Sequence, residues 1–550
     1  MNINTGGIKK YLQKRKWLKY GIIVFVALAL LASLFVFQND FLPGNDKKEY
    51  RISSEMLFSM GRIKTLNPAA SEDEDTYYIT KLIYEGLFEL DNTMTPEPLL
   101  AESYEFNKGK GSVDIKLKSG VKWHDGKDFT ADDVRFTITA LKAAGTKCLY
   151  AEQVSNISGT SVKDDDEIVI YFNDENNVSL DQLTFPVLPE HRYSDIYYSK
   201  TPEDDFRPVG TGPYEYKKFS EAAYLELGAY EDYHGQKAQN SIKFIVLSNR
   251  DNANRLVESS NISVLFSKEA GRAAKISKKN MDTVDFPANE VEYIGYNMES
   301  PSTSKKSVRK AIAYAIDTKT IIEECYYNSG LQNDNLYFPG YLGIKSEKDP
   351  YNYSTGKAAA LLKRAGYKDR DNDGYLESTD GTRLTINIAV DSGNASRISA
   401  AEYIKDFLDN LRIDTYIIEG DWNAYLARLN SKNYDIFIGG LKYTESMDMR
   451  GILSGEGQSN YTGYKNGKMD DMLDEMRSGI TIEDMRSLYG EIKELSKEEL
   501  PYYCLLYKTY GAIKAPALQG EVAPLFFDFY YGCENWKCRY ELTEEKSGEQ

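Results

Sequence analysis

The residues best suited to chemistry lie in the stretch VKWHDGKDFTADDV at 121–134, where His124 stands beside Asp125. A histidine next to a carboxylate can serve as a general base, but no nucleophile accompanies this pair. Asp-Gly is a turn dipeptide, which favours a structural interpretation. The stretch then reads as a strand that ends in a tight turn, with Trp123 buried, followed by a helix capped by Thr130.

Zinc and disulfide chemistry have few residues to draw on. The three histidines, at positions 124, 191 and 234, are far apart and show no ligand spacing, so the sequence predicts neither a zinc site nor a Ser/His/Asp triad. The five cysteines, at 148, 325, 504, 533 and 538, contain no CxxC pair. Cys533 and Cys538 either form a disulfide in an oxidising compartment or remain free thiols.

A calcium loop is a weak alternative in the C-terminal half. Asp369, Asp371 and Asp373 precede a glycine as in the first half of an EF-hand loop, and Asp380 occupies the twelfth position. An EF-hand needs a bidentate glutamate there and a helix on each side. The flanking residues, 375–377 and 384–390, are typical of strands instead, so no metal and no other cofactor is expected.

The N-terminus predicts a membrane anchor. Residues 1–20 hold six basic residues and no acidic one, and 21–38 form an apolar run that ends in a polar residue. Such a run spans roughly 25 Å as a helix, close to the thickness of a hydrocarbon core. Because basic flanks stay in the cytoplasm, the rest of the chain should lie outside the cell membrane, after a linker at 39–50. A cleaved secretory signal is the alternative and would make the protein secreted.

The body beyond the anchor is acidic. The whole chain carries 84 acidic and 67 basic residues, a formal net charge of −17, and six of the basic residues precede the anchor. Nucleic acid is bound mainly through cationic surface, so a nucleic-acid partner is not expected.

Short strand-like runs alternate with helical ones through the body. No fixed repeat period connects them, so the sequence predicts an α/β fold and not a solenoid or propeller. The expected strands are 113–117, 168–172, 242–247, 384–390 and 434–438, and the expected helices are 76–84, 131–143, 307–315, 355–365, 396–411 and 485–499.

Several segments resemble, in order, those of the solute-binding family 5 proteins, the oligopeptide-, dipeptide- and nickel-type extracellular binding components of ABC importers. They are VKWHDGKDFTADDV, LIYEGLFELD at 82–91, PVGTGPYEY at 208–216, VRKAIAYAID at 308–317, NYDIFIGG at 433–440 and NYTGYKNGKMDDML at 460–473. The resemblance covers about 52–520 of the chain.

The resemblance implies a bilobed fold of the periplasmic-binding-protein type that closes on a ligand, without covalent chemistry. It implies a monomer that delivers its ligand to ABC permease subunits. The implied boundaries are lobe I at 51–290 with an extra subdomain at 85–207, lobe II at 291–507, a return to lobe I at 508–540 and a polar tail at 541–550. The two crossings between lobes should be the hinge.

The family's ligand segment follows NYDIFIGG, where a strand edge pairs with the ligand backbone and an aspartate receives the peptide's α-ammonium. Here it reads Leu441, Lys442, Tyr443, Thr444 and Glu445, with Thr444 at the position of the aspartate. A neutral hydroxyl cannot give the charge-assisted bond of a carboxylate. Either Glu445 or Asp448 takes this role, or the ligand is not an ordinary free peptide.

The same resemblance places Glu74 and Asp75 on the opposite wall of the cleft and Trp422 near it. Acidic residues at the cleft favour a cationic ligand. The leading hypothesis is therefore a tethered binding protein that delivers oligopeptides or a similar cationic solute to a permease. A tethered sensor that presents a peptide to another membrane protein is a second hypothesis, and an extracytoplasmic hydrolase is a third, which lacks a visible nucleophile or metal.

Overall fold

A computed structural model describes residues 50–53, 55–193, 207–247, 250–271, 281–346 and 350–541. The predicted basic segment and anchor lie outside these residues, as do nearly all of the linker and the tail. Within the described ranges, no helix is both long enough and apolar enough to cross a membrane. The chain divides into one unit of 1–51 with 540–550 and another of 52–539, and the second unit contains the elements described below except the last two residues of β20 (Lys537–Glu541).

The largest sheet has seven strands in the order β12-β18-β13-β17-β15-β16, with β14 beside β18. β15 pairs in parallel with β16 and β17, and the other pairs are antiparallel. The predicted strands at 384–390 and 434–438 are confirmed within one to four residues. The bounds are β12 Val264–Ser267, β13 Asp282–Tyr296, β14 Gly330–Leu331, β15 Thr385–Asp391, β16 Asp414–Gly420, β17 Ile436–Lys442 and β18 Tyr502–Lys514.

Helices between 306 and 409, each with one apolar face, pack on this sheet and bury a mainly aliphatic core between 294 and 506, which also holds several tyrosines. Side-chain oxygens of Asp317, Ser354, Asn394, Asp421 and Thr481 each accept a bond from the first turn of the helix that follows, which fixes where it starts. The helices are α8 Lys306–Ala315, α9 Thr318–Cys325, α10 Thr355–Arg364, α11 Ala395–Asp409, α12 Trp422–Asn430, α13 Arg450–Leu453, α14 Gly467–Glu475 and α15 Ile482–Glu499.

A second core forms between 87 and 187 on the four-stranded sheet β5-β6-β8-β7. Trp123 is fully buried there, as predicted, and its indole N–H donates to Asp133 at 3.2 Å. Asp133 also completes a capping box with Thr130 at the start of α3. The elements are β5 Ala101–Asn107, β6 Ser112–Leu117, α3 Ala131–Ala144, α4 Ala151–Ser155, β7 Ile157–Asp164 and β8 Glu167–Phe172.

The remaining elements in the described residues are two α-helices and the strands of three smaller sheets. A sheet of order β2-β11-β10-β9 pairs β2 with β11 in parallel, although the paired residues, such as Glu55 and Ser241, are 186 positions apart in sequence. The bounds are β2 Glu55–Met60, α2 Glu74–Thr80, β3 Phe88–Leu90, β4 Pro96–Pro98, β9 Tyr214–Ser220, β10 Tyr224–Ala229, β11 Ser241–Val246, α6 Arg250–Glu258, β19 Leu518–Gln519 and β20 Lys537–Glu541. α2 ends at Thr80, four residues before the predicted end.

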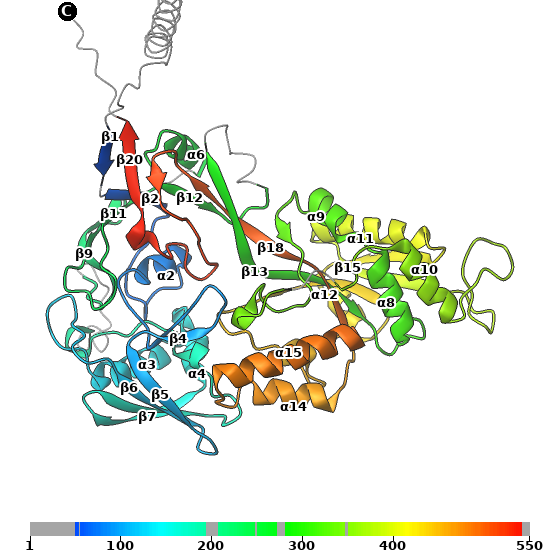
Figure 1. Ribbon diagram of the computed structural model, residues 1–550, viewed down its shortest axis with the longest axis horizontal. Helices are drawn as coiled ribbons and strands as arrows, with labels where there is room; N and C mark the ends of the chain where they lie inside the picture. The colour runs from blue at the N-terminus through cyan, green and yellow to red at the C-terminus, as the bar shows by residue number, and fades with distance from the viewer. Residues whose placement is uncertain are drawn as a thin grey trace, which may run out of the picture. The chain divides into compact units, whose positions relative to one another are not determined.

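β13 and β18 run side by side as the two longest strands (Figure 1). The predicted lobe boundaries at 290/291 and 507/508 fall inside them. The ladder is interrupted there, because Pro287 faces Thr509 while Val291 faces Tyr507. Three residues of β13 therefore lie opposite one residue of β18, as in a β-bulge. The lobe boundaries themselves stay a prediction.

Candidate functional site

The end of β17 offers an unpaired strand edge. β13 pairs with β17 along its whole length, from Ile436 to Lys442. On its other side, β15 reaches only Ile436 and Phe437. Gly440 and Lys442 are exposed to solvent. Among the described strands, none covers the outer edge beyond Phe437; the Ile438 carbonyl accepts from the Tyr425 hydroxyl at 2.9 Å, so an extended ligand can add as a further strand at 439–442.

Glu445, just after this edge, lies against helix α2 and Thr184. Tyr77 donates its hydroxyl hydrogen to Oε1 of Glu445, and Thr184 donates to Oε2 at 3.0 Å. Lys81 forms an ion pair with the same carboxylate at 3.5 Å, and the Glu445 side chain is only 9% exposed. Burial and the Glu445 charge together raise the pKa of Tyr77 far above its usual value, so Tyr77 remains a neutral donor.

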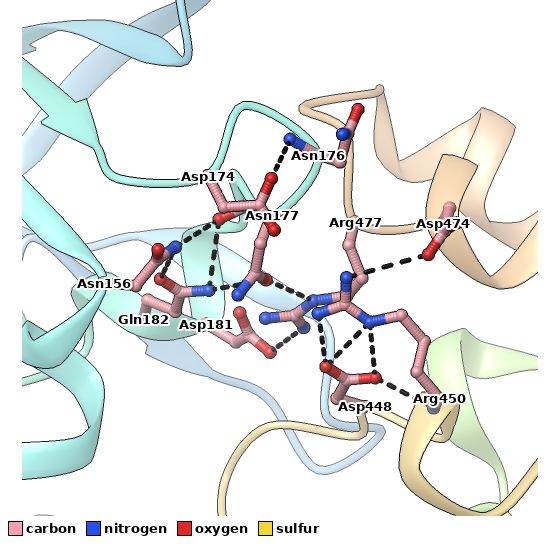
Figure 2. Close-up of polar contacts among 10 residues, drawn as sticks. All are labelled: Asn156, Asp174, Asn176, Asn177, Asp181, Gln182, Asp448, Arg450, Asp474 and Arg477. Atoms are coloured by element: carbon pink, nitrogen blue, oxygen red, sulfur yellow. Dashed lines mark hydrogen bonds and ion pairs between the residues drawn. The ribbon is translucent and has the colours of Figure 1, made fainter. Parts of the chain in front are cut away.

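Asp448, the other predicted carboxylate, is held by Arg450. The guanidinium donates to both oxygens, with Nε at 3.0 and 3.1 Å and Nη2 at 2.6 Å (Figure 2). Burial opposes ionisation of Asp448, but Arg450 and Arg477 outweigh it and lower the pKa. Asp448 is thus an ionised partner of two arginines within its own part of the chain.

A cavity of about 440 Å³ adjoins Glu445. The aromatic rings of Phe527 and Tyr150 line part of the cavity. Lys81, at the end of α2, and Asp528, in the C-terminal loop, line it as well. Burial raises the pKa of Asp528 to about 6, with Lys81 opposing the shift. The lining also holds Glu85, Glu89 and Glu534, which make it predominantly acidic. Such a surface suits the cationic solute predicted from sequence.

The profile of the bacterial extracellular solute-binding proteins, family 5, matches residues 95–460. The chain belongs to this family.

Several of its relatives are named as peptide-binding proteins, and another as heme-binding protein A of Haemophilus influenzae. Oligopeptide-binding protein AppA of Bacillus subtilis (strain 168) is 27% identical over 484 residues, which cover 84% of this chain and 87% of AppA. The dipeptide-binding protein of Escherichia coli (strain K12) is 24% identical over 482 residues, covering 82% of this chain and 88% of that protein.

Solved structures show the same fold. AppA in complex with a nonapeptide gives a TM-score of 0.52 at 23% identity, covering 90% of this chain and 100% of that chain. The nickel ABC transporter protein from Bacillus halodurans gives 0.72 at 16% identity, covering 87% and 98%. This family 5 protein therefore has the mixed α/β fold of periplasmic binding proteins, and it belongs to a family of non-catalytic solute-binding components of ABC transporters for peptides or nickel.

The other predicted site residues take different places in this family 5 protein. Thr444 is exposed, Leu441 is half-buried, and Tyr443 is buried with its hydroxyl donating to the carbonyl of Leu336. Trp422 is 54% exposed at the start of α12.

Of the two acids predicted for the opposite wall, Glu74 forms an ion pair with Lys268, and Asp75 accepts the backbone N–H of Gly61 at 2.6 Å; neither lines the cavity beside Glu445. Lys268 also donates to the hydroxyl of Tyr78 at 3.0 Å. Both predicted acids are thus already engaged within the protein.

The histidines do not form a catalytic set. The Nδ1 of His124 accepts the N–H of Gly210 at 3.1 Å, and its Nε2 lies 3.0 Å from the carbonyl of Gly212, which fixes a neutral tautomer. Burial lowers its pKa. His191 contacts Asp125, and His234 contacts Glu85, each at 2.8 Å. His124 thus holds the loop of the PVGTGPYEY segment in place.

The predicted calcium loop brings three carboxylates together without Asp380. Oxygens of Asp369, Asp371 and Asp373 lie within 4.8 Å of one another. Arg412 pairs with Asp369 at 3.3 Å and Arg383 pairs with Asp373. Asp380 instead accepts from Ser378 and the N–H of Thr382. Arginines thus already neutralise two of the three carboxylates.

The disulfide alternative for Cys533 and Cys538 is wrong, because both are buried free thiols. Cys533 lies 3.7 Å from the Tyr214 hydroxyl, whereas Cys538 lies 3.3 Å from that of Ser263. The two sulfurs belong to different packing environments.

Sequence reasoning missed the wall that faces Glu445. Tyr77 and Lys81 lie on or just after α2, Thr184 follows a short 3-10 turn, and Phe527 comes from the C-terminal loop. Tyr77 and Tyr150 rings lie 5.9 Å apart. These residues carry no shared motif, and only the fold brings them together.

Proposed function

We propose that this protein binds oligopeptides, or a similar cationic solute, outside the cytoplasmic membrane and delivers them to the permease of an ABC importer. The free edge of β17 carries the proposal, because backbone pairing recognises any extended peptide while leaving its side chains to pockets. The acidic cavity beside Glu445 supplies a pocket that favours positive charge. The peptide-binding relatives AppA and the dipeptide-binding protein agree with this choice.

The mechanism is closure of two lobes, 51–290 with 508–540 and 291–507, about β13 and β18. A ligand that contacts both lobes shifts the equilibrium from open to closed, and the closed form engages the permease. The apolar run at 21–38 serves as the tether in this proposal. Tethering raises the local concentration at the membrane, so a modest affinity for the permease suffices.

Native mass spectrometry of the full-length chain in detergent tests the ligand class. The expected result is a ladder of copurified peptides. Recovery of a nickel complex or another small solute, without binding of any added peptide, would overturn the peptide assignment while leaving the family intact.

A peptide identified in this way tests the strand edge. Each backbone nitrogen of the peptide is methylated in turn, and affinity is measured by calorimetry. Added strands use alternate amides, so losses of about tenfold or more should recur at every second residue. Equal tolerance at all positions would show that the β17 edge does not pair with the ligand.

A membrane-tethered sensor is the second candidate. A pull-down from membranes separates the two, since an importer component recovers permease subunits and a sensor recovers a receptor without them.

A further inference from the structure

One side chain, Arg477, joins two segments about 300 residues apart. Its Nη1 donates to Oδ2 of Asp181 at 2.7 Å and its Nε donates to Oδ1 of Asn177 at 3.1 Å (Figure 2). The backbone adds a third bond, from the N–H of Val178 to the carbonyl of Arg477 at 2.6 Å. Asn177, Val178, Asp181 and Arg477 are named the clasp below.

The clasp is buried and separate from the β17 edge. The side chains of Arg477 and Asp181 are 8% and 9% exposed. One half follows β8 in the predicted subdomain 85–207, and the other follows α14 in the predicted lobe II. None of its four residues lines the cavity beside Glu445. Glu445 accepts from Thr184, and Arg477 donates to Asp181. The clasp therefore forms a second contact between the predicted subdomain 85–207 and the predicted lobe II.

Each half of the clasp is prepared within its own segment. Asn156 donates to the carbonyl of Asn177 at 2.6 Å, and Gln182 donates to its side-chain oxygen at 3.0 Å. On the other side, burial lowers the pKa of Arg477, but the charge of Asp181 across the clasp and that of Asp448 within its own segment outweigh this effect and raise the pKa. Little reordering is therefore needed when the halves meet.

Close approach at the clasp also requires a glycine. Gly479, two residues after Arg477, has φ +69°, and a Cβ on it would lie 2.9 Å from Cδ1 of Phe106 in β5. Any other residue would be strained by its backbone and would push the two segments apart.

The energy of such a pair suits a contact that opens. Removing two charges from water costs nearly as much as their attraction returns. Asp181 moreover has one oxygen, Oδ1, without a hydrogen-bond partner among the described residues. Opening would return this oxygen and the guanidinium to water. The clasp therefore specifies how the segments meet without making separation prohibitively costly.

We propose that the clasp is a ligand-independent closing contact, in which Arg477 and Asp181 set the fraction of the empty protein that is closed. This proposal rests on the two-lobe closure of the proposed function. Because closing and binding are linked, a weaker clasp lowers ligand affinity by the factor by which the closed fraction falls. The clasp thus tunes affinity without touching the ligand.

Distance measurement on the ligand-free, full-length chain tests this directly. Spin labels are attached to cysteines introduced by Glu152→Cys in α4 and Glu402→Cys in α11, both exposed positions, since the native thiols are buried. Arg477→Met should move a major part of the distance distribution to an open population. An unchanged distribution would overturn the proposal.

Arg450→Met is the matched control, because it removes an arginine whose partners Asp448 and Asp474 belong to its own segment. It should leave the distribution as in the unsubstituted chain, and a shift equal to that of Arg477→Met would also count against the clasp. Should Arg477→Met not fold, Asp181→Asn keeps the shape of the side chain and should shift the distribution in the same direction.

Peptide affinity separates this proposal from the proposed function. With a hexapeptide that binds the unsubstituted chain, Arg477→Met should lower affinity about tenfold, mainly through faster dissociation. If no peptide binds the unsubstituted chain but Arg477→Met still opens it, the clasp stands and the peptide function fails. If affinity falls without any opening, the clasp proposal fails.

Discussion

Tyr77 donates its hydroxyl hydrogen to the carboxylate of Glu445, which connects helix α2 to the segment that follows the β17 edge. Glu445 is therefore the carboxylate at the predicted ligand segment that faces another part of the molecule. Asp448, by contrast, is bound by an arginine two residues away. The sequence left open whether Glu445 or Asp448 binds the ligand's ammonium. Substituting each in turn and measuring peptide affinity would distinguish the two.

Glu445→Gln should lower affinity for a peptide with a free amino terminus by about tenfold, because a neutral amide replaces a charge-assisted bond to the ammonium. Affinity for the N-acetylated form of the same peptide should change by less than about twofold. Asp448→Asn, as the control, should affect neither. Equal affinities of the Glu445→Gln variant and the unsubstituted chain for the free peptide would mean that the ligand's amino end is not read by Glu445.

The pH dependence of stability should carry a contribution from Asp528. Burial raises its pKa to about 6, so the folded protein binds this proton more tightly than the unfolded chain does. Its contribution is present below about pH 4 and is lost as the pH rises through about 6, by about 3 kcal/mol. Asp528→Asn should be more stable than the unsubstituted chain at pH 7 and equal to it at pH 4. Urea denaturation of both proteins at both pH values checks this. A difference in unfolding free energy between variant and unsubstituted chain that is the same at pH 4 and pH 7 would contradict the prediction.

Asp133 should be among the most costly residues to remove from the second core. Its carboxylate accepts from the Trp123 indole at 3.2 Å and from the backbone N–H groups of Thr130 and Glu190 at 2.9 and 2.8 Å. Asp133→Ala leaves these buried donors without partners and should cost about 3 kcal/mol or more. Thr130→Ala, which weakens only the cap, should cost about 1 kcal/mol. Denaturation followed by tryptophan fluorescence ranks the two, and similar costs would show that the cap alone matters.

The thiols give a simple test of the buried environments described above. All five cysteines are free and buried, so a thiol reagent should react with none quickly in the folded protein and with five after denaturation. Recovery of three thiols in denaturant without reductant would reveal a disulfide.

The sequence predicted most strands and helices because their apolar periodicity is local. The capped helix after Thr130 and the buried Trp123 follow from residue types within fourteen positions. α2 ends earlier than predicted, since its apolar residues continue into turns at Leu82 and Ile83 that bond to Tyr214 and Gly212. Apolar pattern alone does not separate such turns from helix.

The site was less accessible to sequence reasoning. Ordered family segments led to Glu445, but its partners Tyr77 and Thr184 are 368 and 261 residues away. The ion pair of Arg477 with Asp181 has no local signature either. Long-range pairs of this kind depend on how whole segments dock, which a single sequence does not reveal.

The interrupted ladder between β13 and β18 has a mechanical consequence. β13 and β18 pair inside a seven-stranded sheet, and at 288–290 the hydrogen bonding between these two strands is interrupted. Under the proposed closure, the two strands would twist relative to each other at this interruption. A small rotation at this point would displace each side chain in proportion to its distance from the two strands. Hydrogen bonds far from the two strands, such as those of Arg477, would therefore form or break with a small rotation. Their presence or absence would indicate whether the protein is open or closed.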